Sequence, residues 1–187
     1  MTQRQRMLVA VVAAVAEKGF AEMTVADVVA HAGVSRRTFY EHFDDKLDCF
    51  LQAYVARAEF VLESIEARVH ELGPGAGWRE RLHAGLGAYL ERLAAQPESA
   101  RVLNVDVLGA GPRALALRER VLERFVAQYR GLGDEDMLRA LVGGIAEMVQ
   151  ARLLAGEAES LPDLLPTLER FAFAVVGARD RGEAWVA

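Results

Sequence analysis

The chain has 187 residues, of which 52% are hydrophobic and 7% aromatic, a composition typical of a packed globule rather than a disordered chain. Its formal net charge of −5 gives no general attraction for nucleic acid. No apolar run approaches the ~18 residues of a membrane-spanning helix and no charged-then-apolar leader opens the chain, so we expect a cytoplasmic protein with no membrane partner.

The first predicted helix covers residues 5–18. Its apolar positions form one wide stripe that consists of Met7, Leu8, Val11, Val12, Val15 and Ala16. Gly19 is expected to end the helix. Arg4 and Arg6 precede it, and we expect them to lie in solvent, with a contact to a DNA backbone as the alternative.

A second helix is expected to begin after Thr24. The hydroxyl of Thr24 is placed to cap the first free N–H groups, and Asp27, three residues later, is placed to reach back in a capping box. The apolar residues that follow recur at helical spacing, so one face is buried. Gly33 is expected to end the helix in the left-handed conformation.

A third helix is expected to be capped by Ser35. Phe39 and Phe43 lie four residues apart and are expected in the core. The outward residues are suited to bonding bases and phosphates, and they are Arg36, Arg37, Thr38, Tyr40 and His42. Two helices joined by a short turn, the second polar outward, predict a helix-turn-helix. The alternative is a plain three-helix unit with solvated arginines.

From about Arg6 to Tyr54 the chain resembles, without a gap, the DNA-binding domain of TetR-family transcriptional regulators. The most specific part of the match is GVSRRTFYEHF followed three residues later by Lys46. The resemblance implies a DNA-binding domain at residues 1–46, joined by a long helix to a ligand-binding and dimerisation domain at residues 47–187. It also implies that Lys46 holds phosphate. The predicted contacts with a double-stranded DNA operator are Thr24, Ser35, Arg36, Arg37, Thr38, Tyr40, His42 and Lys46.

The charge is unevenly distributed along the chain. Residues 1–46 carry six basic and six acidic groups, so the 16 basic and 21 acidic groups of residues 47–187 give the whole deficit. A neutral domain attracts DNA weakly at long range. We therefore expect affinity to come from locally placed cations and from two copies acting together.

Asp44 is expected to begin a long helix that runs to about Leu72, before the turn sequence GPGAG at 73–77. Further helices are predicted over residues 78–95, 99–108, 113–130, 134–155 and 163–179, with Pro97 ending the first of them. Pro166 must lie in the first turn of the last helix, which makes Asp163 its expected cap. No strand-like alternation occurs, so the predicted fold class is all-α.

The last two helices are apolar nearly all round, which is more than one subunit easily buries. In the TetR family these helices form a four-helix interface, where Gly143 with Gly144 would permit close crossing. The predicted homodimer interface comprises Leu141, Gly144, Ile145, Met148, Leu168, Phe171 and Val175. The alternative is that both helices fill the core of one subunit.

The apolar stretch 102–108 contains two polar residues, Asn104 and Asp106, and is preceded by a third, Arg101. We expect them to point outward, with fixed partners in a ligand cavity as the alternative. The family resemblance implies a pocket for a small-molecule effector, whose identity the sequence leaves open. Its candidate lining residues are Phe60, Trp78, Tyr89, Leu103, Asn104, Phe125 and Tyr129.

No catalytic, phosphate-binding or dinucleotide motif occurs in the sequence. The single cysteine, Cys49, and four scattered histidines do not have metal-ligand spacing, so we expect no enzyme, no cofactor and no metal site. The predicted function is a dimeric transcriptional regulator, a repressor released from its operator by an effector. The alternative is a helical small-molecule binding or scaffold protein that does not bind DNA.

Overall fold

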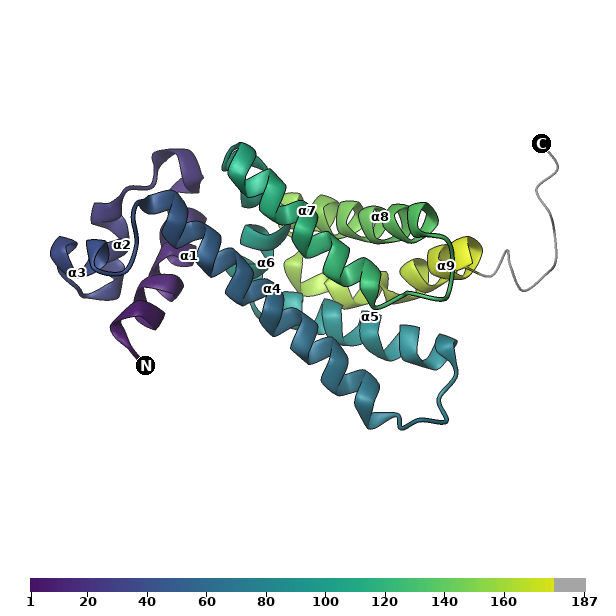
Figure 1. Cartoon of the computed structure of the whole chain (residues 1–187). Helices are drawn as coiled ribbons and strands as arrows, with labels where there is room; N and C mark the ends of the chain where they lie inside the picture. Colours follow the sequence, from purple (N-terminus) through teal and green to yellow (C-terminus); the bar gives the residue numbers. More distant parts are fainter. Residues whose placement is uncertain (177–187) are drawn as a thin grey trace. The chain divides into compact units, whose positions relative to one another are not determined.

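The computed structural model describes residues 1–176, which contain nine α-helices, two short 3₁₀ helices and no β-strand (Figure 1). The helices are α1 (Gln3–Glu22), α2 (Val25–Ala32), α3 (Arg36–Tyr40), α4 (Lys46–Glu71), α5 (Trp78–Ala95), α6 (Pro97–Asn104), η1 (Asp106–Gly109), α7 (Pro112–Ala127), α8 (Glu135–Leu154), η2 (Ala158–Leu164) and α9 (Leu165–Val176). The all-α prediction is confirmed. Within the described range no helix combines the length and the apolar character needed to cross a bilayer.

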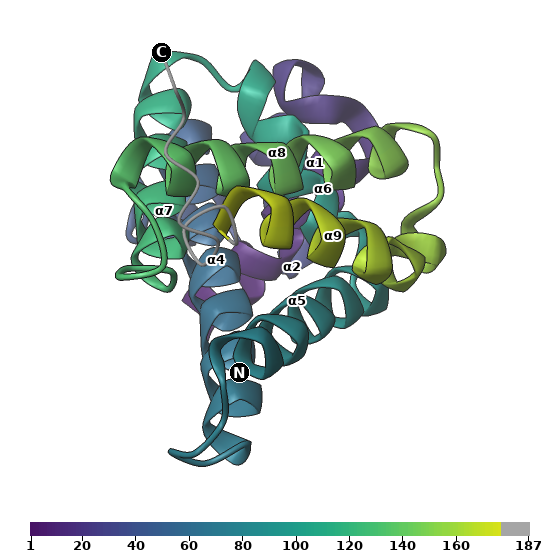
Figure 2. The same ribbon diagram turned by 90° about the vertical axis from the view of Figure 1, so that its right-hand side faces the viewer.

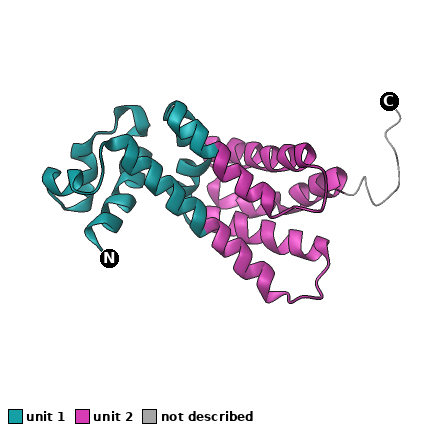
Figure 3. Cartoon of the chain, viewed as in Figure 1, with its two compact units in different colours: residues 1–60, 96–118 teal, residues 61–95, 119–187 magenta. Residues whose placement is uncertain are grey.

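The chain forms two compact units, coloured separately in Figure 3. Unit 1 comprises residues 1–60 and 96–118, and unit 2 comprises residues 61–95 and 119–187. The division falls inside α4 and inside α7. The predicted boundary between a DNA-binding and a ligand-binding domain at residue 46 stays a prediction, because the two compact units are divided at other positions.

In unit 1, α1 contacts α2, α6 and η1. Thr2 and Gln5 form a capping box, so α1 begins two residues before the predicted start. Gly19 has φ 74° and interrupts the helical conformation as expected, but helical residues resume after it and continue to Glu22. The largest buried side chains of this unit are Met7, Met23, Phe39, Phe43, Phe50 and Tyr54.

In unit 2, α5 contacts η2 and α9, and α8 contacts η2 and α9 (Figure 2). Gly85 lets α5 approach the end of α4, because a Cβ at this position would lie 3.4 Å from the Ile65 side chain and 3.6 Å from that of Val69. Apolar side chains fill the centre of the unit, and the fully buried ones include Leu90, Leu93, Leu141, Leu161 and Leu168.

Several predicted helix ends shift. α4 begins at Lys46 rather than at Asp44, and the carboxylate of Asp45 caps it by accepting the N–H of Asp48 at 2.7 Å. Pro97 opens α6 instead of only closing the helix before it, because proline fits the first turn of a helix. The helix predicted over residues 99–108 accordingly splits into α6 and η1.

The last helix was predicted from residue 163, with Asp163 as its cap, which is wrong. Residues 158–164 form the 3₁₀ helix η2, and α9 starts at Leu165 with Pro166 in its first turn. Pro166 lacks an N–H and tolerates only this early position, so that part of the prediction is confirmed. The predicted end at residue 179 lies outside the described residues.

Three of the predicted interface residues are part of the subunit core. Leu141 and Leu168 are fully buried and Ile145 is 6% exposed, so these side chains have little surface left for another copy. A Cβ on Gly144 would lie 2.8 Å from the Phe171 ring, which shows that this glycine serves the close packing of α8 on α9 within one subunit. Met148, Phe171 and Val175 retain partial exposure.

The side chain of Asp106 is only 11% exposed, where the sequence favoured an outward position. Within residues 1–176 its Oδ2 has no hydrogen-bond partner, and Nη2 of Arg101 lies 3.9 Å from Oδ1. Burial raises the pKa of Asp106, and the nearby Arg101 guanidinium opposes that shift. Asn104 is buried as well, and its Nδ2 donates to the carbonyl of Ala100 at 3.0 Å.

Asp106→Asn is expected to raise the free energy of unfolding at neutral pH by about 1 kcal/mol, since it removes a poorly paired buried charge. The pKa of Asp106 is raised in the folded state, so the advantage of the variant should shrink as pH falls toward the ordinary value of 3.8. Urea unfolding curves at several pH values measure the difference. Asp163→Asn, an exposed control, should change stability little, and an Asp106→Asn variant less stable than wild type would contradict this account.

Candidate nucleic-acid interface

The helix-turn-helix is built from three local signals in the sequence. The Thr24 hydroxyl accepts the N–H of Asp27 at 3.3 Å, and the Asp27 carboxylate accepts the N–H of Thr24 at 2.8 Å. Gly33 has φ 61° and ends α2 in the left-handed conformation, and Ser35 accepts the N–H of Thr38 at 3.0 Å at the start of α3. The capping box, the glycine and the second cap are all confirmed.

The outward side of α3 carries the groups that are free to bond DNA. Arg36 and Tyr40 of α3, and His42 in the turn that follows it, are exposed and have no hydrogen bond or ion pair within residues 1–176. The side chain of Arg37 is 90% exposed, and its Nε donates to the carboxylate of Glu41 at 3.1 Å. The faces of α3 therefore present two guanidinium groups and a phenol.

The predicted hydroxyl contacts already have partners in the protein. Thr24 Oγ1 donates to the carboxylate of Asp27 at 2.8 Å, and the hydroxyls of Ser35 and Thr38 bond each other at 2.9 Å. Each of these residues is a cap or part of a cap. A phosphate would compete with these bonds, so the residues serve the local fold in the free protein.

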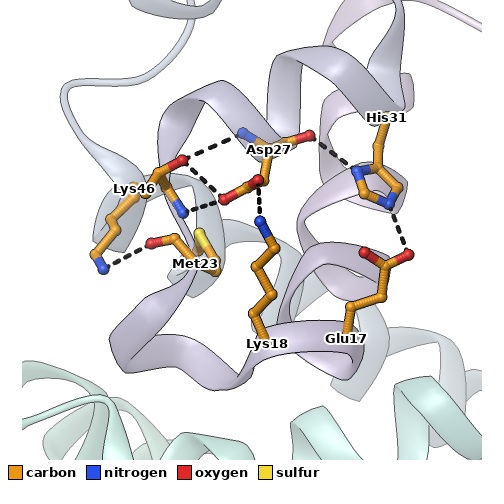
Figure 4. Close-up of polar contacts among 7 residues, drawn as sticks. Glu17, Lys18, Met23, Asp27, His31 and Lys46 are labelled. Carbon is orange, nitrogen blue, oxygen red and sulfur yellow. Dashed lines mark hydrogen bonds and ion pairs between the residues drawn. The ribbon is translucent and has the colours of Figure 1, made fainter.

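Lys46 has a different environment from the one predicted. Its Nζ lies 3.1, 3.0 and 2.8 Å from the carbonyl oxygens of Phe20, Ala21 and Met23 (Figure 4 shows the contact with Met23). The side chain of Lys46 is half-buried. Its cation binds the end of α1, an interaction that the sequence pattern did not reveal.

The two arginines near the start of the chain also bond inside unit 1. Arg4 donates to Gln52 and lies over the Phe43 ring, and Arg6 donates to the carbonyl of Gly33 at 3.3 Å. Arg4 is exposed, as expected, and Arg6 is half-buried, but both arginines have partners within the unit. Of the six basic groups in residues 1–46, Arg36 and Arg37 are the ones directed away from the framework of the unit.

A polar network joins α1 to α2 (Figure 4). A hydrogen bond from the Lys18 ammonium lowers the pKa of Asp27 to about 2, and hydrogen bonds from the hydroxyl and N–H of Thr24 make the next largest contributions. The two ring nitrogens of His31 face the carbonyl of Asp27 at 2.9 Å and the carboxylate of Glu17 at 3.1 Å. These two acceptors, the carbonyl first, raise the pKa of His31 above its ordinary value of 6.5.

The network predicts two pH limits of stability. The pKa of His31 is raised, so its contribution is present below about pH 6.5 and is lost as the pH rises through the higher folded value. The pKa of Asp27 is lowered, so its contribution is present above its ordinary pKa of 3.8 and is lost as the pH falls toward about 2. The urea midpoints of wild type and of His31→Gln, measured at pH values on both sides of the His31 titration, should converge as the pH rises. A constant difference would rule out the contribution of His31 charge.

The predicted pocket residues are divided between the two units. In unit 2, Tyr89 and Phe125 meet with ring centroids 6.1 Å apart, while Trp78 stacks edge-on against Phe173 at 5.5 Å. Burial raises the pKa of the Tyr129 phenol to about 12. In unit 1, Phe60 is 39% exposed and Leu103 is half-buried, beside the buried Asn104 described above.

A pocket of about 340 Å³ lies between the end of α7 and the start of α8, and it contains none of the predicted lining residues. It is lined by Glu123, Val126, Arg130, Gly131, Gly133, Glu135, Leu138 and Arg139. Half of these residues are charged, unlike the mostly apolar lining of a typical small-molecule site. Within residues 1–176 no cluster of three or more His, Cys, Asp or Glu side chains is arranged to hold a metal ion.

Cys49 is buried, and its thiol donates weakly to the carbonyl of Met7 at 3.9 Å. Burial raises the pKa of this thiol to about 12, so it stays protonated at neutral pH. Cys49 is thus a small buried side chain of the unit 1 core.

Residues 8–53 match the family model described as bacterial regulatory proteins, tetR family. The repressor BepR of Brucella suis biovar 1 (strain 1330) is 39% identical over 62 residues, which are 33% of this chain and 29% of BepR. The regulator CymR of Pseudomonas putida is 27% identical over 142 residues, which are 76% of this chain and 66% of CymR. The matched regions thus span less than two thirds of either relative.

The solved structure of FadR, a fatty acid degradation regulator from Bacillus halodurans, matches with a TM-score of 0.82 and covers 96% of this chain and 97% of that chain. At 18% identity this likeness shows the fold alone. The matched residues 8–53 contain the helix-turn-helix described above, with its caps, its turn and its outward arginines. The helix-turn-helix part of the chain, residues 8–53, is that of the TetR family of bacterial regulatory proteins.

Proposed function

We propose that the protein is a sequence-specific DNA-binding transcriptional regulator that acts as a repressor. The observation that carries this proposal is the outward side of α3 and of the turn after it, where Arg36, Tyr40 and His42 are exposed and have no hydrogen bond within residues 1–176. A guanidinium group bonds guanine through two parallel hydrogen bonds in the major groove. The phenol and the imidazole are suited to phosphate oxygens.

The proposed regulator binds as a homodimer. Unit 1 has few free cations, so a single copy would release few counterions and hold DNA weakly. Two copies would place two α3 helices on two half-sites of a palindrome, one or two helical turns apart. The exposed positions of α8, rather than its buried ones, are the proposed contact surface, and they include Met137, Ala140, Gly143, Ala151 and Leu154.

A small-molecule effector is proposed to release the operator. The effector would favour a state in which α4 tilts and the spacing of the two α3 helices changes. A preference of about 1 to 3 kcal/mol for that state would change operator affinity by about 5- to 150-fold.

The test titrates candidate effectors against the protein bound to the DNA upstream of its own gene. Fatty acyl compounds form one arm of the screen, because the Bacillus halodurans neighbour regulates fatty acid degradation. Repression with induction predicts that one compound lowers operator affinity at least 5-fold. Undiminished DNA binding at a saturating concentration of a compound shown to bind the protein would reject this mechanism and leave DNA binding itself untouched.

A further inference from the structure

The ammonium group of Lys46 is fully used within unit 1. An ammonium carries three N–H donors, and Lys46 has three carbonyl acceptors at 2.8 to 3.1 Å, on Phe20, Ala21 and Met23. The Phe20 ring adds a cation–π contact at 5.1 Å from Nζ. A phosphate oxygen would find no free donor on this side chain.

The acceptors exist because of the way α1 ends. Gly19 at φ 74° turns the chain, and the last carbonyls of a helix have no partner inside the helix. Such carbonyls carry partial negative charge, which favours a cation beside them. Lys46 supplies that cation from the first residue of α4.

The bonded segment leads directly into the helix-turn-helix. Met23 is the last of the three acceptors, and the next residue, Thr24, is the N-cap of α2. Met23 is itself fully buried, and its N–H donates to the carbonyl of Gly19 at 3.1 Å. The position and direction of the first residue of α2 therefore depend on the contacts of Lys46.

We propose that Lys46 acts in DNA binding as a positioning residue that fixes the turn between α1 and α2, and that its side chain does not bind a DNA phosphate. This inference rests on the proposed DNA-binding function. It departs from the role that the family resemblance implies for this lysine. Direct contacts would come instead from the side chains on α3.

The two roles predict different effects of substitution. Lys46→Met keeps the apolar stem and removes the cation, and Lys46→Arg keeps the charge but carries its donors in a planar fork that does not converge on three carbonyls. A positioning role predicts that both variants lower the melting temperature of the DNA-free protein, by about 3 to 8 °C for Lys46→Met. A phosphate role predicts little change in melting temperature and retained operator affinity for Lys46→Arg.

The salt dependence of operator binding separates the roles a second time. Loss of one phosphate contact reduces the slope of log affinity against log salt by about 0.9, whereas loss of positioning weakens binding with the slope unchanged. Arg36→Met is the matched control, because this side chain has no bond to the part of the chain that the structure describes and its loss should leave the melting temperature unchanged. A reduced slope together with an unchanged melting temperature in Lys46→Met would overturn the proposal.

A third measurement needs no variant. The Nζ ammonium of Lys46 in the wild-type protein should give a slowly exchanging NMR signal that does not shift when operator DNA is added, and a shift on binding would contradict the positioning role. The melting and NMR measurements on the free protein test the three carbonyl bonds even if no DNA sequence is bound. Failure of wild type to bind any operator would refute the proposed function separately.

Discussion

Replacing Phe39 with alanine is expected to lower the free energy of unfolding by about 3 to 5 kcal/mol. Phe39 is fully buried, and its ring lies 5.4 Å from those of Tyr40 and Phe43. Because α3 has five residues, packing by this side chain rather than helix propensity must hold it in place. Operator binding should be lost with the packing of α3.

Urea unfolding followed by circular dichroism measures this loss of stability. The matched control is Tyr40→Ala, since Tyr40 is the next residue in the same helix and is 56% exposed. The control should change the unfolding midpoint little while weakening DNA binding. Equal destabilisation by the two substitutions would show that α3 is not anchored through Phe39.

Arg36→Ala is expected to weaken operator binding by about 1 to 3 kcal/mol per half-site, which is roughly 5- to 150-fold. The side chain is exposed and has no partner in residues 1–176, so its removal should leave the stability of the free protein unchanged. The loss should be confined to the preferred sequence and smaller on unrelated DNA, because a base contact carries specificity.

Fluorescence anisotropy with the operator and with scrambled DNA measures both affinities. Arg36→Lys keeps the positive charge but lacks the two-pronged geometry of a guanidinium group. This variant should therefore keep most non-specific binding and lose discrimination between sequences. If Arg36→Ala weakens both DNAs equally, the side chain contacts the backbone and does not read a base.

The helix-turn-helix was predictable because its signals are local. A capping box needs only Thr24 and Asp27 at the right spacing, and a left-handed helix end needs only Gly33. The same holds for Ser35 at the start of α3. Each signal involves residues within a few positions of one another, so no knowledge of the tertiary fold was required.

The role of Lys46 was not predictable from local sequence. Its three acceptors lie 23 to 26 residues earlier in the chain. They are backbone carbonyls, which every residue has, so the side-chain sequence does not mark them. Arg6, which bonds the carbonyl of Gly33, 27 residues away, is a second example. A basic residue beside a helix-turn-helix is predicted to contact DNA from the sequence alone, even when its cation is bonded within the protein.

The roles of the predicted interface and pocket residues also depend on tertiary packing, but for a different reason. The prediction for Leu141, Ile145 and Leu168 rests on their apolar character, which a subunit core requires as much as a dimer interface does. Tyr89 and Trp78 are large aromatic residues, and they belong to different aromatic pairs within unit 2. The apolar character of such side chains indicates that they are buried, but the packing of the helices decides which residues they contact.

The most direct measurement is a footprint of the DNA upstream of the protein's own gene, made with wild type and with Arg36→Ala at the same protein concentration and salt. We predict that wild type protects two half-sites separated by one or two helical turns, and that the Arg36→Ala variant, equally folded, loses this protection. Wild-type protein that is folded but protects no sequence, or protection that is unchanged in Arg36→Ala, would contradict the account of α3 as the helix that reads the operator.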